Sequence, residues 1–133
     1  LIALKHIACK EDDKISTARE ISLQYGLSFN LLARILLILK NADILVSIQG
    51  TKGGYSLNTD LNNLTLLDFL QIISGQPLSL TACLSDNKQE KRQCRIQPAR
   101  CNILNSIKYI QAKIDDLAKK TTLNDIIHKT SDN

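Results

Sequence analysis

The order of the elements that follow residue 14 constrains the fold of this chain most strongly. The stretch "ISTAREISLQYG" (15–26) predicts a short helix with Ser16 as its N-cap and Gly26 at its end. Serine accepts a hydrogen bond from a free N–H at a helix start, and glycine readily adopts the positive φ of a helix end. Shortly afterwards Ser28 is a second cap, and "SFNLLARILLILKN" (28–41) predicts a second helix. Two short helices joined by a tight glycine turn have the spacing of a helix-turn-helix.

A β-hairpin is expected directly after the second helix. The stretch "ILVSIQ" (44–49) alternates in polarity and is rich in β-branched residues, "GTKGG" (50–54) is a flexible turn, and "YSL" (55–57) is a returning strand. A helix-turn-helix followed at once by a hairpin is the element order of a winged helix. We therefore predict a mainly α-helical protein with one small β-hairpin, built as a winged helix-turn-helix head and a long dimerisation helix.

An amphipathic helix, the long helix and a short final helix are expected after the hairpin. The first of these, "LTLLDFLQII" (64–73), has Thr65 as its cap. In "CNILNSIKYIQAKIDDLAKK" (101–120), apolar residues recur at alternating steps of four and three, which is the a/d pattern of a coiled-coil seam. They are Ile103, Ile107, Ile110, Ile114 and Leu117. The pattern favours a homodimer formed through a partner helix, and the alternative is an ordinary helix packed on its own core.

Length and composition fit one domain, or a small domain with an appendage. We expect residues 1–75 to form the winged head, with a first helix that starts before Leu1, residues 76–101 to form a cysteine-rich sensor loop, and residues 102–133 to form the dimerisation helix and a C-terminal helix. No apolar run approaches the roughly 18 residues of a membrane span. Four cysteines in 133 residues are too few for a disulfide-rich secreted domain, so a reducing, cytoplasmic setting is expected.

Three of the four cysteines lie in one polar, basic loop. Residues 83–101 hold five Lys or Arg against two Asp or Glu, whereas residues 1–60 hold seven against six. Ten residues separate Cys83 from Cys94, and six separate Cys94 from Cys101. Zinc sites usually bring cysteines in closely spaced pairs, which this loop lacks, whereas an iron–sulfur cluster accepts ligands from a longer loop. From the residues alone, an iron–sulfur site, a disulfide redox switch and incidental surface thiols all stay open.

The second helix of the pair and the tip of the hairpin carry side chains suited to DNA. A recognition helix inserts its N-terminal turns into the major groove, where asparagine can read adenine and arginine can read guanine or hold a phosphate. Phe29 would either contact a thymine methyl group or join the core. Lys52 at the hairpin tip is placed to reach a phosphate or the minor groove. The candidate DNA-binding residues are Ser28, Phe29, Asn30, Arg34, Gln49 and Lys52.

Taken in order, these pieces resemble the Rrf2 family of bacterial winged-helix transcriptional regulators. "ISTAREISLQYGLS" is similar to the family's first helix-turn-helix segment, "GTKGGYSL" to its wing, and "LTLLDFLQIISG" to the helix after the wing. The three-cysteine loop, the dimerisation helix and "TTLNDII" follow in the family's order, so the resemblance covers nearly the whole chain. It implies a homodimeric repressor that binds a palindromic operator in double-stranded DNA and senses iron–sulfur status, nitric oxide or redox state.

Within the family, the loop resembles that of the NsrR and SUF-operon regulators more than that of IscR. The resemblance implies an iron–sulfur cluster, 2Fe-2S or 4Fe-4S, on Cys83, Cys94 and Cys101, which need not survive purification. IscR-like members use a His three residues after the third Cys, where this chain has Leu104, so the fourth ligand would come from a residue before Leu1.

Two other kinds of protein stay open as alternatives. One is a cluster-free regulator controlled by an effector or a protein partner, and the other is a zinc-stabilised interaction module. An enzyme is not expected, because the sequence shows no nucleophile–base pair, no phosphate loop and no paired acids placed for catalysis.

Overall fold

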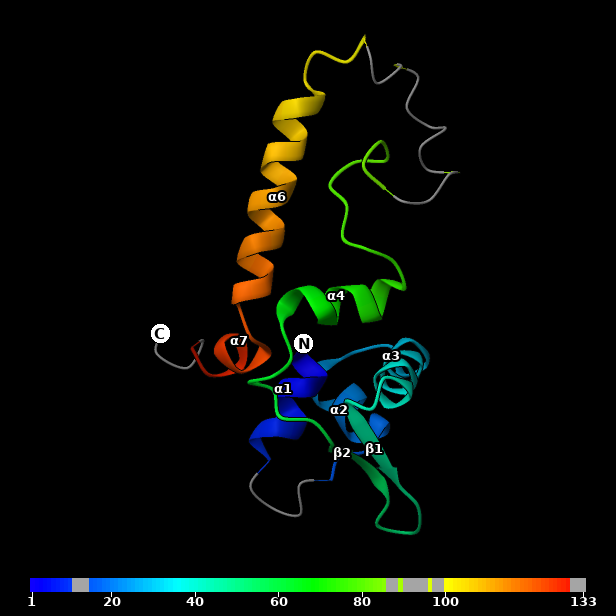
Figure 1. The fold of residues 1–133 in the computed structure, drawn as a ribbon. Helices are drawn as coiled ribbons and strands as arrows, with labels where there is room; N and C mark the ends of the chain where they lie inside the picture. Colours follow the sequence, from blue (N-terminus) through cyan, green and yellow to red (C-terminus); the bar gives the residue numbers. More distant parts are fainter. Residues whose placement is uncertain (11–14, 86–88, 90–95, 97–99, 130–133) are drawn as a thin grey trace.

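A helical head, a two-stranded wing and one long helix that rises from the head make up the molecule (Figure 1). The structure is a computed structural model that describes residues 1–10, 15–85, 89, 96 and 100–129. Its elements are α1 (Ile2–Cys9), α2 (Ala18–Tyr25), α3 (Phe29–Asn41), β1 (Leu45–Ile48), β2 (Gly54–Leu57), α4 (Leu66–Ser74), α6 (Leu104–Lys120) and α7 (Leu123–Lys129). This order confirms the predicted mainly helical, winged-helix fold. None of the described helices is both long and apolar enough to pass through a bilayer.

The two helices of the predicted helix-turn-helix begin at side-chain caps and meet at a left-handed glycine. Gly26 has φ 63° and ψ 31° and ends α2, as predicted. Ser28 caps α3 with its side chain, also as predicted. The cap of α2 is Thr17 rather than Ser16, because Thr17 and Glu20 satisfy each other's backbone N–H groups in a capping box. The prediction for Ser16 was wrong because the backbone of that residue pairs with the wing instead.

The wing is a short antiparallel hairpin with a further backbone segment at its side. Ser47 of β1 lies opposite Tyr55 of β2. Beside β2, Ser16 donates its N–H to Tyr55 O at 2.9 Å and accepts from Tyr55 N–H at 2.8 Å. A Cβ at Gly54 would lie 2.7 Å from Ser16 O, so this close approach of two backbones requires glycine. The bridge fixes the wing relative to the start of α2.

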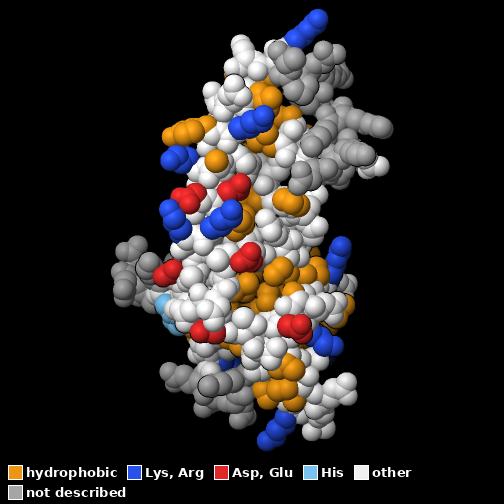
Figure 2. All heavy atoms as spheres, in the orientation of Figure 1, with side chains coloured by type: hydrophobic (Ala, Val, Ile, Leu, Met, Phe, Trp, Pro, Cys, Tyr) orange, Lys and Arg blue, Asp and Glu red, His pale blue; other side chains and the backbone are white. Residues whose placement is uncertain are grey.

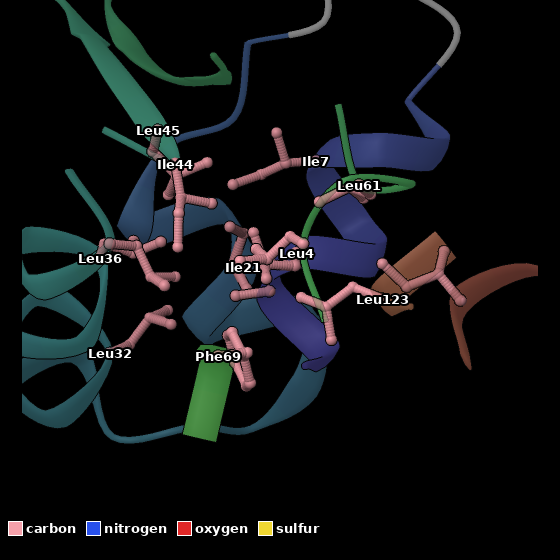
Figure 3. Close-up of a cluster of buried hydrophobic side chains, with 14 residues drawn as sticks. Leu4, Ile7, Ile21, Leu32, Leu36, Ile44, Leu45, Leu61, Phe69 and Leu123 are labelled. Carbon is pink, nitrogen blue, oxygen red and sulfur yellow. The ribbon is translucent and has the colours of Figure 1, made fainter. Parts of the chain in front are cut away.

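Apolar side chains from every part of the head meet in one core (Figure 3). Figure 3 shows Leu4 and Ile21 near the centre of the cluster, which Leu36 enters from α3. The buried members of the core are Ala3, Leu4, Ile7, Ile21, Leu32, Leu36, Leu39, Ile44, Leu45, Leu61, Leu64, Phe69, Leu123 and Ile127. Because α3 contributes residues 32, 36 and 39 at helical spacing, its opposite face is directed outward.

The C-terminal helix α7 closes the head, whereas α6 stands clear of it (Figure 1). Leu123 N–H donates to Leu64 O at 2.9 Å, so the start of α7 pairs with the segment that leads into α4. Leu123 and Ile127 of α7 are buried members of the core. Ala118 is the one buried residue of α6. Most of the surface of α6 therefore faces away from the head.

Candidate DNA-binding face and thiol segment

The outer face of α3 presents to solvent the side chains that were predicted to read DNA. Ser28, Asn30 and Arg34 are exposed. Phe29 is 50% exposed, which rules out the core role that the sequence left open. Asn30 and Arg34 lie one turn apart, and Leu37 follows on the same stripe with 50% exposure. These three residues form one outward stripe along α3, and the major groove of DNA is wide enough to admit an α-helix.

Two residues of α2 extend this outward face and were not among the predicted contacts. Leu23 is 75% exposed, and Arg19 is exposed as well. Together with Ser22 and Phe29 they line a shallow hollow of about 350 Å³. Arg19 thus lies exposed on the helix that, in a helix-turn-helix, crosses the DNA backbone. The sequence could have indicated that Leu23 is exposed, because helical spacing places Leu23 away from the buried face of α2 that contains Ile21.

The wing tip carries one cation on an exposed turn. Gln49 and Lys52 are exposed, and Gly53 N–H donates to Gly50 O at 3.0 Å to close the turn. Gly50 has φ 117°, a conformation that glycine adopts without strain. Within the part of the chain that the structure describes, the ion pairs involve neither Arg34 nor Lys52. Both charges are therefore available to an anionic partner.

A charged network behind this face holds α1 against α2. Lys10 Nζ donates to Glu20 Oε1 at 2.8 Å. His6 Nε2 lies 3.4 Å from the same oxygen, and His6 Nδ1 lies 3.3 Å from Tyr25 Oη. The hydrogen bond from Lys10 lowers the pKa of the Glu20 carboxyl below its ordinary value. His6 therefore has a structural role in holding α1 against α2.

Cys83 lies in a hydrogen-bonded turn on the approach to the loop. Leu84 N–H donates to Thr81 O at 3.0 Å, so residues 81–84 form a turn with Cys83 at its third position. The Ser79 hydroxyl donates to the same carbonyl at 2.8 Å. Thr81 Oγ1 lies 3.1 Å from Cys83 Sγ. Cys83 is half-buried, and its thiol is free.

Cys101 lies at the other end of the loop, directly before α6. It is half-buried with a free thiol, and its carbonyl accepts from Leu104 N–H at 3.5 Å. Cys94, the third predicted ligand, lies outside the described residues. Leu104 is half-buried in the first turn of α6, and its hydrocarbon side chain offers no metal ligand.

Cys9 is exposed at the end of α1. The buried stripe of α1 consists of Ala3, Leu4 and Ile7. Cys9 falls outside the stripe and is also separate from the loop in sequence.

The described residues do not by themselves complete a cluster site. An iron–sulfur cluster takes four protein ligands, and the described part of the loop supplies Cys83 and Cys101. In the ranges that the structure describes, no three His, Cys, Asp or Glu side chains are grouped to hold a metal ion. The thiols of Cys83 and Cys101 are both half-buried, one at each end of the loop.

The a/d side chains of α6 form an exposed apolar face. Of the five predicted a/d residues, Ile103, directly before α6, is 56% exposed, Ile110 is 49% exposed and Leu117 is 67% exposed. The other two, Ile107 and Ile114, are half-buried. Figure 2 shows apolar side chains at the surface along the column that α6 forms, among acidic and basic ones. An ordinary helix packed on its own core would bury this stripe, so its exposure favours the interpretation as a seam for a partner helix.

The comparison with known families covers almost the whole chain. The Rrf2 family, described as "Iron-dependent Transcriptional regulator", matches residues 1–129. The chain belongs to the Rrf2 family. The predicted family is thereby confirmed, and so is a regulatory rather than an enzymatic role.

Relatives and solved structures agree with this membership. The chain is 33% identical over 92 residues to the HTH-type transcriptional regulator BadM of Rhodopseudomonas palustris, and the match spans 69% of this chain and 58% of BadM. It is 28% identical over 123 residues to the regulator CymR of Bacillus subtilis, spanning 91% of this chain and 85% of CymR. The solved structure of that CymR, called the global cysteine regulator of B. subtilis, has a TM-score of 0.68 at 25% identity, with 95% of this chain and 88% of CymR covered. IscR of T. potens shares the fold, with a TM-score of 0.66 at 17% identity and 97% and 80% of the two chains covered.

Proposed function

We propose that this Rrf2 regulator binds a palindromic operator through α3 and the wing, and that its three-cysteine loop controls this binding. The observation that carries the proposal is the outward stripe of α3, where Asn30 and Arg34 are exposed while the opposite face of the helix fills the core. Exposed Asn and Arg side chains on a firmly packed helix are what base reading in the major groove requires. The compartment of a chromosome-bound regulator is the cytoplasm, which we propose for this protein.

Each proposed DNA contact has a defined chemical role. Asn30 pairs with an adenine edge, and Arg34 pairs with guanine or holds a phosphate. Phe29 contacts a thymine methyl group. Three further residues position the protein on the sugar–phosphate backbone and in the minor groove: Ser28 at the N-terminus of α3, and Gln49 and Lys52 on the wing. The proposed contacts are thus Ser28, Phe29, Asn30, Arg34, Gln49 and Lys52.

The proposed assembly is a homodimer that pairs the exposed seam of α6 with the same seam of a second copy. Two-fold symmetry of the protein would match a palindromic operator with two half-sites. A repressor is the simplest action for such a dimer, since its bound form covers promoter DNA.

The proposed sensor is the set of Cys83, Cys94 and Cys101. Support comes from the family description as iron-dependent and from the half-buried, free thiols at the two ends of the loop. The proposed cofactor is an iron–sulfur cluster, 2Fe-2S or 4Fe-4S, which would supply a group that iron supply, nitric oxide or oxidants can remove.

A second candidate is a cluster-free regulator controlled through an effector or a protein partner. The similarity to CymR over 91% of the chain favours it, as does Leu104 at the position where IscR-like relatives have a His ligand. Here the loop thiols would respond as thiols or would take no part in regulation.

A gel shift with the DNA upstream of the protein's own gene tests the DNA-binding half of the proposal. We expect a specific complex at low salt that weakens steeply as salt is added, because phosphate contacts release counterions. No complex at low salt, with either the cluster-free or the reconstituted protein, would overturn DNA binding.

Anaerobic purification with an absorption spectrum and with iron and sulfide counts tests the sensor half. The cluster hypothesis predicts a coloured protein with stoichiometric iron and sulfide. A colourless, iron-free protein after anaerobic reconstitution contradicts it. Unchanged regulation in the triple variant Cys83→Ser, Cys94→Ser, Cys101→Ser would then favour the effector-controlled candidate.

A further inference from the structure

Gln111, midway along α6, holds the chain segment that leads to Cys83. Its Oε1 accepts from Leu80 N–H at 2.7 Å. Its Nε2 donates to Leu78 O at 3.0 Å and to Asp115 Oδ1 at 2.8 Å. One carboxamide therefore uses its carbonyl and both of its N–H groups at the same time. We call this set of Gln111, Asp115, Leu78 and Leu80 the Gln111 latch.

The chemistry of the latch requires a carboxamide. The Leu80 N–H can only donate, whereas the Leu78 carbonyl and an ionised Asp115 can only accept. A glutamate at this position would bring an acceptor against two acceptors, and a lysine would leave the Leu80 N–H without a partner. Asp115 also orients the amide, because it accepts the N–H that does not reach the main chain. The latch thus pairs two main-chain groups that would otherwise need water or a neighbouring strand.

Short contacts continue from the latch to the thiol. Beyond Leu80, the Thr81 carbonyl accepts from the Ser79 hydroxyl at 2.8 Å and from Leu84 N–H at 3.0 Å. Thr81 Oγ1 lies 3.1 Å from Cys83 Sγ. The segment between the latch and Cys83 is therefore a single hydrogen-bonded turn, so the latch is one of the contacts that set the place of the thiol relative to α6.

The latch also borders the seam of α6. Ile110 directly precedes Gln111, and Ile114 follows it within one turn. Cys101 directly precedes the N-terminal end of α6, whereas the segment that carries Cys83 is held at Gln111. Gln111 lies roughly 10 Å further along the helix axis than Leu104, at about 1.5 Å per residue. The two described thiols are thus tied to α6 at two levels, and a change in their separation acts on the helix between these levels.

We propose that Gln111 is a positioning residue that transmits the state of Cys83 to the seam of α6 and so to operator affinity. The proposal rests on the loop acting as a sensor, as proposed above. With the latch formed, a change at the thiol is carried by a contiguous set of packed and hydrogen-bonded residues to Ile110 and Ile114. With the latch broken, the loop changes without moving the helix.

The first test measures the position of the thiol by its reactivity. Gln111→Glu keeps the shape of the side chain and removes both donors, and Asn105→Asp makes the same amide-to-carboxylate change on an exposed part of α6. Iodoacetamide alkylation of Cys83 is followed by mass spectrometry on the full chain, with exposed Cys9 as the internal reference. A pH roughly one unit above the ordinary thiol pKa of about 8.5 makes accessibility, rather than ionisation, set the rate.

We expect Gln111→Glu to raise the Cys83-to-Cys9 rate ratio by roughly fivefold or more, the factor that a single net hydrogen bond represents. Asn105→Asp should leave the ratio unchanged. Adding Asp115→Asn to Gln111→Glu supplies an N–H donor to the new carboxylate and should recover part of the slow rate, which a general loss of helix stability would not allow. An unchanged ratio in Gln111→Glu, with circular dichroism showing a folded protein, overturns the latch.

The second test measures coupling. Operator affinity is determined with the thiols reduced and with the thiols alkylated, in the wild type, in Gln111→Glu and in Asn105→Asp. The affinity ratio compares these two states of the thiols. We expect a large affinity ratio in the wild type and in Asn105→Asp, and a ratio near one in Gln111→Glu. A wild-type ratio that Gln111→Glu preserves overturns the coupling role and leaves the sensor function standing. A wild-type ratio of one overturns the sensor function itself, and the coupling role with it.

Discussion

Replacing Ile110 by lysine should break the proposed dimer and leave the head folded. Ile110 lies at the middle of the seam and is 49% exposed in the single chain. A fully buried isoleucine contributes about 1.5–3 kcal/mol, so burying the exposed half against a partner contributes about 1 kcal/mol per chain. Two chains then lose about 2 kcal/mol, and the Coulomb repulsion of two facing ammonium groups adds a further cost of about 1–2 kcal/mol. At about 1.4 kcal/mol per factor of ten, the dimer dissociation constant should rise by roughly 100- to 1,000-fold.

Sedimentation equilibrium over a wide concentration range measures this shift. Ala112→Lys is the matched control, because residue 112 is exposed and lies on the face of α6 opposite the seam, at about 100° per residue. The control should keep the wild-type dissociation constant and an unaltered circular dichroism spectrum. Equal dissociation constants for Ile110→Lys and Ala112→Lys, or a wild type that stays monomeric at high concentration, would refute the seam.

Further outcomes follow from the same contacts. Arg34→Ala should weaken binding to the preferred operator by about 1–3 kcal/mol and should weaken binding to scrambled DNA much less. Lys52→Ala should weaken binding to both DNAs alike and should reduce by about one the slope of log affinity against log salt concentration. Fluorescence anisotropy measures both effects. Gly54→Ala should lower the free energy of unfolding by about 1–3 kcal/mol in urea melts, because its Cβ would lie 2.7 Å from Ser16 O, and an unchanged melt would contradict the close approach. The lowered pKa of Glu20 means that its pairing with Lys10 stabilises the fold above the ordinary glutamate pKa and loses this contribution as the pH falls through the depressed value. Lys10→Met should therefore lose less stability than the wild type between pH 6 and pH 3, by under about 1 kcal/mol for so exposed a pair, and parallel pH profiles would exclude the effect.

Local signals were sufficient to predict the winged helix. Gly26 and Ser28 act through groups within one helical turn, and Thr65 caps α4 in the same way, so the structure agrees with the sequence at all three positions. Ser16 was misassigned because its role depends on Tyr55, a residue far along the chain with which its backbone pairs. Neighbouring Ser and Thr residues are equally good cap candidates in the sequence, and the pairing of Ser16 with Tyr55 is what leaves Thr17 as the cap.

The sensor segment could be predicted only in part. The cysteines and their spacing are visible in the sequence, but the role of Gln111 depends on main-chain groups of Leu78 and Leu80, more than thirty residues earlier. A glutamine on a long amphipathic helix gives no local sign of such contacts. Likewise Phe29 was open between core and surface, because the helical spacing of α3 alone does not say where the edge of its buried stripe lies.

Control of operator affinity by the loop thiols is what distinguishes the proposed sensor from a regulator that binds DNA constitutively. The most direct measurement is the affinity of one anaerobic preparation for its own upstream DNA and for a scrambled sequence, before and after alkylation of the thiols, beside the triple variant Cys83→Ser, Cys94→Ser, Cys101→Ser. We predict specific binding whose affinity changes on alkylation in the wild type and stays constant in the triple variant. Specific binding that is the same in all of these states would contradict control by the thiols.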